Sequence, residues 1–157
     1  MKAYRLGSAG PQWDELDLDG IGAKTTGGRW NHIDTPMVYA SSSIALAVLE
    51  TVVHTNARRF PLNRFVVEVD IPDSLFRGRR VVSPPPPDAW DSVPESFKTK
   101  DFGSAWVAAR RELILDVPSL IIPQERNYLL NPLHESRRTV RTKNLGRFVY
   151  DARLLGF

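Results

Sequence analysis

Residues 45–54 read ALAVLETVVH, an apolar segment that carries one carboxylate, Glu50. Serines occupy positions 41 to 43, and serine is a favoured N-cap residue, so we predict a helix from there to about Asn56. Because this helix would be apolar on nearly every face, we expect it to be central and covered on both sides. The fold is therefore expected to form around it.

Glu50 is the first candidate functional residue, because a carboxylate is almost never fully buried without a partner. Within such a helix it must face a cleft, be paired, or be protonated. Arg29 is a candidate partner that would keep it ionised. Two other readings stay open: a helix face that opens to solvent, and a structural hydrogen bond with His54, four residues further on the same face.

Composition restricts the class of protein. The 157 residues, 42% of them hydrophobic, fit one compact domain over positions 1–157. The chain lacks cysteine and its three histidines are scattered at 32, 54 and 134, so we expect neither thiolate chemistry nor a metal site. The longest fully apolar run, Ile44 to Leu49, is too short to cross a bilayer, and we expect a cytoplasmic protein without membrane contact.

The pattern of elements predicts an α+β domain, because helices and strands are mixed without regular βαβ alternation. One helix is expected from Asp101 to Leu113, and loops at 7–28 and around the four prolines that begin at position 84. Strand-like segments are 3–6, 36–40, 63–71, 113–123 (two strands or one bent strand) and 147–155.

Several phosphate and catalytic motifs are absent. GIGAKTTGG (20–28) has Ala23 where a P-loop needs glycine before lysine, and no Rossmann glycine pattern or nucleophile elbow occurs. GGRWN (27–31) remains: two glycines let the backbone approach a ligand, and the planar fork of Arg29 suits a phosphate. An ordinary turn with a surface ion pair is the alternative. Tyr39 is either a core aromatic or a ring on which a flat heterocycle stacks.

Three blocks in this order, GGRWN (27–31), TPMVYASSSIALAVLETVVH (35–54) and VPSLIIPQERNYLLNPLH (117–134), resemble the RES domain family, the toxins of bacterial Xre/RES toxin–antitoxin pairs. The arginine, glutamate and serine that name the family map onto Arg29, Glu50 and Ser119. The match adds Tyr39 and Asn131. His134-Glu-Ser departs from the His-Pro of many members and bears only on the local loop.

The resemblance implies a fold like that of ADP-ribosyltransferase toxins, with split mixed β-sheets and flanking helices. It also implies that NAD is consumed as a substrate, without a prosthetic group, by cleavage of the nicotinamide–ribose bond. Glu50 would hold the ribose and offset its positive charge, Arg29 would grip the pyrophosphate or ribose, and Tyr39 would stack on nicotinamide. Ser119 and Asn131 would complete the pocket with hydrogen bonds.

The acceptor stays open, because water, inorganic phosphate and a protein side chain are all compatible with the resemblance. We favour NAD hydrolysis or phosphorolysis that blocks growth, with ADP-ribosylation of a cellular protein as the alternative. The expected partner is a cognate Xre-family antitoxin, and a homodimer within that complex stays open.

A basic nucleic-acid-binding or nuclease protein is the least favoured reading, because no aromatic platform, zinc finger or helix-turn-helix accompanies the charge. The net charge of +3 and the pI near 9.4 are equally compatible with an acidic antitoxin segment or a phosphate-bearing metabolite. The basic residues concerned are Arg77, Arg79, Arg80, Arg137, Arg138, Arg141, Lys143, Arg147 and Arg153.

Overall fold

The computed structural model describes residues 1–54, 62–82 and 88–155. The strands are β1 (Lys2–Gly7), β2 (Val38–Ser41), β3 (Phe65–Asp70), β4 (Arg80–Val81), β5 (Ile114–Pro118), β6 (Arg126–Leu130) and β7 (Arg141–Arg147). The α-helices are α1 (Ile21–Thr26), α2 (Ile44–His54), α3 (Asp73–Arg77) and α4 (Phe97–Ala109), with 3₁₀ turns at Glu135–Thr139 and Ala152–Leu155. The predicted strands at 3–6, 36–40 and 63–71 are confirmed as β1, β2 and β3.

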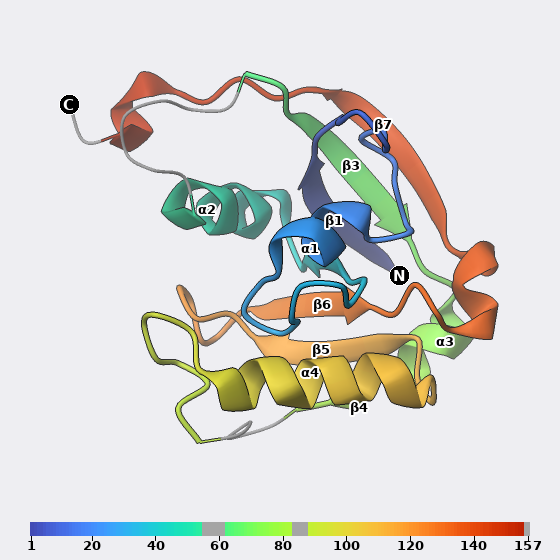
Figure 1. Ribbon diagram of the computed structural model, residues 1–157. Coiled ribbons are helices and arrows are strands. Elements are labelled where there is room, and N and C mark those ends of the chain that lie inside the picture. Colours follow the sequence, from blue (N-terminus) through green and yellow to red (C-terminus); the bar gives the residue numbers. More distant parts are fainter. Residues whose placement is uncertain (55–61, 83–87, 156–157) are drawn as a thin grey trace.

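The strands form one mixed sheet in the order β4-β5-β6-β2-β1-β3-β7, in which β4 and β5 are parallel and the other neighbours are antiparallel. β1 and β2 pair only through Tyr4 and Ser41. The group β1-β3-β7 therefore turns away from the group β4-β5-β6-β2, as Figure 1 shows. This split mixed sheet with helices beside it is the α+β architecture that the sequence predicts.

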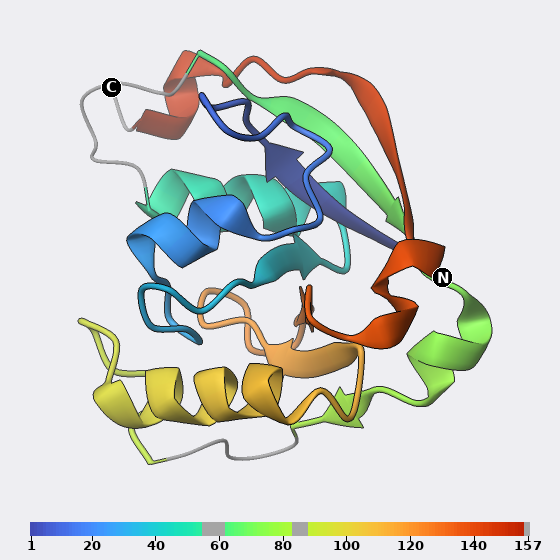
Figure 2. The same cartoon turned by 45° about the vertical axis from the view of Figure 1, so that its right-hand side comes forward.

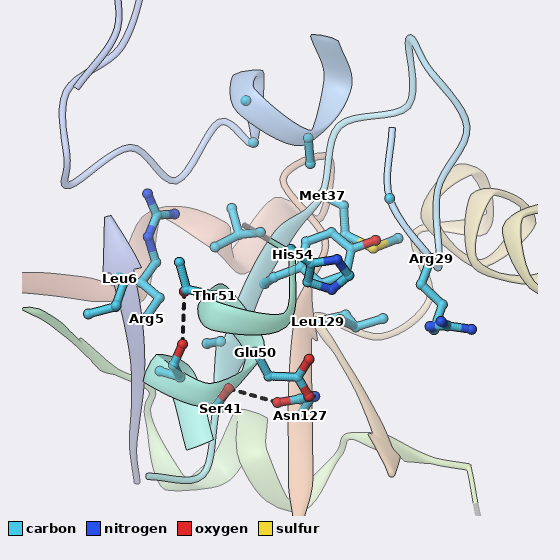
Figure 3. A pocket seen from close by; sticks show the side chains of 18 of the residues that line it. Arg5, Leu6, Arg29, Met37, Ser41, Glu50, Thr51, His54, Asn127 and Leu129 are labelled. Carbon is cyan, nitrogen blue, oxygen red and sulfur yellow. Dashed lines mark hydrogen bonds between the residues drawn. The ribbon is translucent and has the colours of Figure 1, made fainter. Parts of the chain in front are cut away.

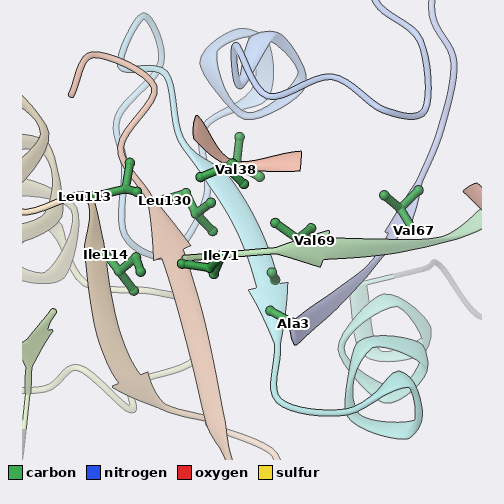
Figure 4. Packing of buried hydrophobic residues seen from close by; sticks show 10 residues of the cluster. Ala3, Val38, Val67, Val69, Ile71, Leu113, Ile114 and Leu130 are labelled. Atoms are coloured by element: carbon green, nitrogen blue, oxygen red, sulfur yellow. The ribbon is translucent and has the colours of Figure 1, made fainter. Parts of the chain in front are cut away.

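Two hydrophobic clusters hold the sheet, because alternate residues of a strand point to opposite faces. The first contains Ala3, Val67, Val69 and Ile114, and Figure 4 shows how β1, β3 and β5 bring them together. The second lies under α4 and contains Trp30, Met37, Val82, Trp106, Val107, Leu115, Val117 and Leu129. Figure 2 shows α4 running along β5, where it covers this face. β5 is thus buried on both faces.

The prediction that α2 is a central helix covered on both sides is wrong. Only Leu46 and Ala47 are buried, and Val53 is 61% exposed. The helix lies beside β1 and β2 with one face toward the sheet (Figures 1 and 2). Its start is as expected, because the Leu46 amide donates to Ser43 Oγ at 3.1 Å; its predicted end at Asn56 lies outside the described residues.

Other boundaries also differ from expectation. The stretch 7–28, expected as a loop, contains α1, which buries no residue and so has no apolar periodicity to reveal it. α4 begins at Phe97 because Ser96 caps it, and it ends at Ala109 because Arg110 adopts a left-handed conformation. Residues 113–123, expected as two strands or one bent strand, contain the single strand β5 followed by a turn.

The C-terminal strand expected at 147–155 is also wrong. β7 ends at Arg147, and residues 152–155 form a 3₁₀ turn. The residues of β7 are mostly polar and exposed, because β7 pairs with β3 on one side only and lies at the sheet edge. Charged residues commonly protect edge strands from pairing with other chains. Because β7 therefore lacks alternating apolar residues, its sequence did not indicate a strand.

Gly103 of α4 provides a test of the packing between this helix and the segment 27–31. A Cβ at position 103 would overlap the carbonyl oxygen of Trp30. Gly103→Ala should therefore lower the free energy of unfolding by about 1 to 3 kcal/mol in urea titrations. Helix propensity alone predicts the opposite sign, about 1 kcal/mol of added stability. An equal or more stable variant would show that α4 does not pack closely on Trp30.

Candidate active site

A cavity of about 490 Å³ lies between α1, α2 and the strands β1, β2 and β6. Its size is typical of pockets that bind small molecules. Figure 3 shows that side chains from separate elements converge on it. Its polar and aromatic lining includes Arg5, Trp13, Arg29, Tyr39, Glu50, His54, Arg64 and Asn127. Three of the predicted site residues, Arg29, Tyr39 and Glu50, thus line one cavity.

Glu50 is half-buried on the pocket side of α2, and two neutral donors hold one of its carboxylate oxygens. Ser119 Oγ donates to Oε1 at 2.9 Å, and Asn127 Nδ2 donates to the same oxygen at 2.5 Å. Such charge-assisted hydrogen bonds are among the stronger ones in proteins. Within the described residues Oε2 accepts no hydrogen bond. The carboxylate is therefore fixed by one oxygen, and the other is left for a ligand.

The two donors are themselves fixed by the backbone around them. Ser119 begins the turn after β5, and its Oγ accepts from the Ile121 and Ile122 amides, each at 3.1 Å, which directs its hydroxyl hydrogen to Glu50. Asn127 lies opposite Ser41 in the β2–β6 register, and Ser41 Oγ donates to Asn127 Oδ1 at 2.7 Å (Figure 3). The amide of Asn127 must then turn its nitrogen to Glu50.

Arg29 does not pair with Glu50, contrary to the candidate pairing. Its Nη1 donates to the carbonyl oxygens of Trp90 at 2.8 Å and Ser92 at 2.9 Å, and Figure 3 shows its guanidinium pointing away from Glu50. His54 also lines the pocket, but no hydrogen bond joins it to Glu50 within the described residues. Neutral donors, not a cation, thus hold the carboxylate.

The GGRWN segment reaches the pocket through a tight turn. Gly27 has φ 71°, and a Cβ at Gly28 would lie 2.7 Å from Tyr39 Oη, so both positions require glycine. Tyr39 Oη accepts from the Trp30 amide at 3.1 Å and donates to Asn31 Oδ1 at 2.7 Å. Burial raises the pKa of the Tyr39 phenol well above its usual value, which keeps this hydroxyl a donor.

The predicted pocket role of Asn131 does not agree with its position. Asn131 is fully buried, donates from Nδ2 to the Val107 carbonyl at 2.9 Å and accepts from the Leu133 amide, and it does not line the cavity. Asn127, four residues earlier, takes the place beside Glu50. The sequence offers both asparagines in NYLLN, and only the pairing of β6 with β2 distinguishes them.

Three arginines among the lining residues make the cavity suited to an anion. Arg5 donates to the carbonyl oxygens of Asp17 at 2.8 Å and Glu15 at 3.2 Å, and burial lowers its pKa. The described part of the chain contains no group of three His, Asp or Glu side chains placed to hold a metal ion. In the same residues, no helix is long and apolar enough to span a bilayer.

Three of the basic residues considered for nucleic-acid binding have carboxylate partners: Arg79 with Asp116, Arg137 with Asp19 and Arg153 with Asp151. Arg79 Nε donates to Asp116 Oδ2 at 2.8 Å, and Arg126 Nε donates to Asp116 Oδ1 at 2.6 Å. This buried carboxylate therefore ties two arginines to β5. Arg141, Lys143 and Arg147 lie on the edge strand β7.

The sequence matches the family model described as RES domain over residues 2–151. It is 40% identical over 153 residues to the Prs ADP-ribosylating toxin of Sphingobium sp. (strain YBL2), covering 97% of this chain and 95% of that protein. It is 39% identical over 121 residues to Toxin Res of Yersinia enterocolitica, covering 76% of this chain and 78% of that toxin. Toxin Res of Photorhabdus laumondii is 33% identical over 159 residues, 99% of this chain and 97% of that toxin.

Among solved structures, the fold is similar to that in the crystal structure of the M. tuberculosis MbcT–MbcA toxin–antitoxin complex. The TM-score is 0.54 with 18% sequence identity, and the alignment covers 92% of this chain and 84% of that one. At this identity the likeness establishes the fold alone. It confirms the predicted α+β fold.

Ser119 allows a test of the hydrogen bonds that hold Glu50. Ser119→Ala leaves two backbone amides and the carboxylate without this partner, so it should lower the free energy of unfolding by about 1 to 3 kcal/mol. Urea denaturation measures the change. Ser74→Ala, at an exposed position of α3, is the matched control and should change stability by less than about 0.5 kcal/mol. Equal stability of the two variants would contradict the network.

Proposed function

This chain belongs to the RES domain family, and we propose that it is the toxin of a toxin–antitoxin pair and that it cleaves the nicotinamide–ribose bond of NAD. Three relatives carry the name toxin, and one of them is named an ADP-ribosylating toxin. ADP-ribosylation takes its ADP-ribosyl group from NAD and releases nicotinamide. The proposed substrate follows from that chemistry.

The observation that carries the proposal is the fixed carboxylate of Glu50 in a pocket whose lining also includes three arginines. Loss of neutral nicotinamide leaves positive charge on the ribose, as in glycoside hydrolysis. A preorganised carboxylate stabilises that charge without reorganising during the reaction. We assign this role to Glu50 Oε2, while Ser119 and Asn127 act as positioning residues through Oε1. We assign to Asn127 the role that the family resemblance implies for Asn131.

Arg29 and Tyr39 are proposed to bind the substrate. The N–H groups on Nε and Nη2 of Arg29 make no hydrogen bond within the described residues, and together they form a fork that suits the pyrophosphate. Tyr39 presents a ring in the pocket lining on which nicotinamide can stack. The remaining cations, Arg5 and Arg64, add positive potential for an anionic dinucleotide.

For the acceptor, we propose water or inorganic phosphate, so that the cytoplasmic NAD pool is depleted and growth stops. Transfer to a cellular protein is the second candidate, and the name of the Sphingobium relative supports it. An antitoxin of the Xre family is the proposed partner. The toxin–antitoxin complex with a similar fold supports a partner of this kind.

Glu50→Gln should abolish NAD cleavage and growth inhibition, because the amide keeps the shape of the side chain and loses its charge. Purified protein is incubated with NAD, with and without phosphate, and nicotinamide and ADP-ribose products are separated by chromatography. A requirement for phosphate identifies phosphorolysis, and free ADP-ribose without phosphate identifies hydrolysis. We expect the rate to fall by at least about a hundredfold.

Glu135→Gln is the matched control, because Glu135 is exposed in a surface 3₁₀ turn and the same atoms are exchanged. It should cleave NAD at the wild-type rate. A folded Glu50→Gln protein with full activity would refute the role assigned to Glu50. Loss of NAD only when a cell extract is added would indicate transfer to a protein acceptor.

Arg29→Ala should weaken NAD binding by about 1.5 to 3 kcal/mol, the range for a hydrogen bond to a charged group. Titration calorimetry measures this in the Glu50→Gln background, in which NAD is not consumed. Arg141→Ala on the exposed strand β7 removes the same charge from a remote element and is the control. Unchanged affinity in Arg29→Ala would rule out a grip on the phosphates.

A further inference from the structure

We propose that the segment 88–96 positions Arg29 for substrate, through a clamp formed by the backbone carbonyl groups of Trp90 and Ser92. This inference rests on the proposed function in taking NAD as the substrate. It assigns a role to the part of this loop that follows the run of four prolines. The positioning residues are Trp90 and Ser92.

The clamp is defined by two short hydrogen bonds from one nitrogen. Arg29 Nη1 donates to the Trp90 carbonyl at 2.8 Å and to the Ser92 carbonyl at 2.9 Å. Because a guanidinium group is planar, fixing both hydrogens of Nη1 also fixes the plane of Nη2 and Nε. The edge of the fork that remains is therefore held in one orientation before any anion arrives.

Aromatic packing holds the segment 88–96 against residues 28–32, which include Arg29. The Trp90 ring stacks on the ring of Trp30, with centroids 6.4 Å apart and planes 26° apart. Trp30 is buried and meets Phe102 of α4 edge to face, with centroids 6.1 Å apart. Since Trp30 follows Arg29 directly, the same contact fixes the Arg29 backbone and the carbonyl groups that bind its side chain.

α4 supports both sides of this arrangement. Ser96 ends the clamp segment and caps α4, because its Oγ accepts from the Thr99 amide at 3.2 Å. On the other side, the His32 amide donates to Ser104 Oγ at 3.1 Å, and Gly103 allows close contact with the Trp30 carbonyl. Both segments, 88–96 and 28–32, are thus held by contacts with α4.

The physical need for a clamp comes from the position of Arg29. The residue follows two glycines, and an arginine side chain has many rotamers, so ordering it only on binding would weaken affinity. A clamp that orders it beforehand removes this cost. The opposite role can also be tested. If the carbonyl groups of Trp90 and Ser92 kept Arg29 away from the phosphates of NAD, their loss would strengthen NAD binding.

The experiment compares Trp90→Ala with wild type in steady-state NAD cleavage. We expect KM to rise about five- to tenfold, because the side chain must be ordered at binding, and kcat to stay within about twofold, because Glu50 is untouched. Trp90→Phe keeps a stacking ring and should restore most of the wild-type KM. Val93→Ala truncates an apolar side chain of the same segment that is 82% exposed, and it should match wild type.

Two additions make the outcome decisive. Ser92→Gly loosens the same backbone without touching Trp30 and should raise KM in the same direction, so the test does not depend on the folding of Trp90→Ala. Inorganic pyrophosphate, titrated into each variant by calorimetry, probes the Arg29 fork without any reaction and so separates the clamp from the proposed NAD chemistry.

Weaker pyrophosphate binding in Trp90→Ala and Ser92→Gly, with Val93→Ala unchanged, would support the clamp even if NAD were not cleaved. Equal binding in all variants would overturn it, as would a wild-type protein that does not bind pyrophosphate. A lower KM in Trp90→Ala would also overturn it and would show that the segment sequesters Arg29.

Discussion

The need to hold a carboxylate at a half-buried position without a cation constrains most of this structure. Glu50 Oε1 accepts from Ser119 Oγ in the turn after β5 and from Asn127 Nδ2 on β6. Those donors reach the carboxylate only if β6 pairs with β5 and β2 in the observed register. Breaking that register would leave a half-buried carboxylate without these partners, which is a costly defect in a fold.

Ser41 shows how the site depends on the split of the sheet. Its backbone pairs with Tyr4 of β1 at the point where the two strand groups meet, and it lies opposite Asn127 of β6. Its hydroxyl donates to Asn127 Oδ1, which orients the amide toward Glu50. The cavity is lined by residues from both strand groups at this junction. The junction between the two strand groups thus lies beside the cavity. It also places Ser41, which orients Asn127 toward the Glu50 carboxylate.

The fold was predictable where burial leaves a periodic pattern. Val67 and Val69 alternate toward the core, so β3 was found, whereas β7 is polar at the sheet edge and α1 buries nothing, so neither was found. The apolar composition of α2 led to the wrong prediction that both sides of the helix are buried, because an apolar helix can still have an exposed face. Val53 is largely exposed, and nothing in the composition of the segment distinguishes it from buried Leu46.

For the site, the sequence by itself determined the residue types and their order along the chain. An isolated carboxylate among apolar residues marked Glu50, and a glycine pair marked Arg29. Only the tertiary structure decided the partners: Asn127 in place of Asn131, and backbone carbonyl groups in place of Glu50 for Arg29. The physical reason is that these contacts join residues 61 to 77 positions apart. Strand register and helix packing set such contacts, and neither is encoded within any one stretch of sequence.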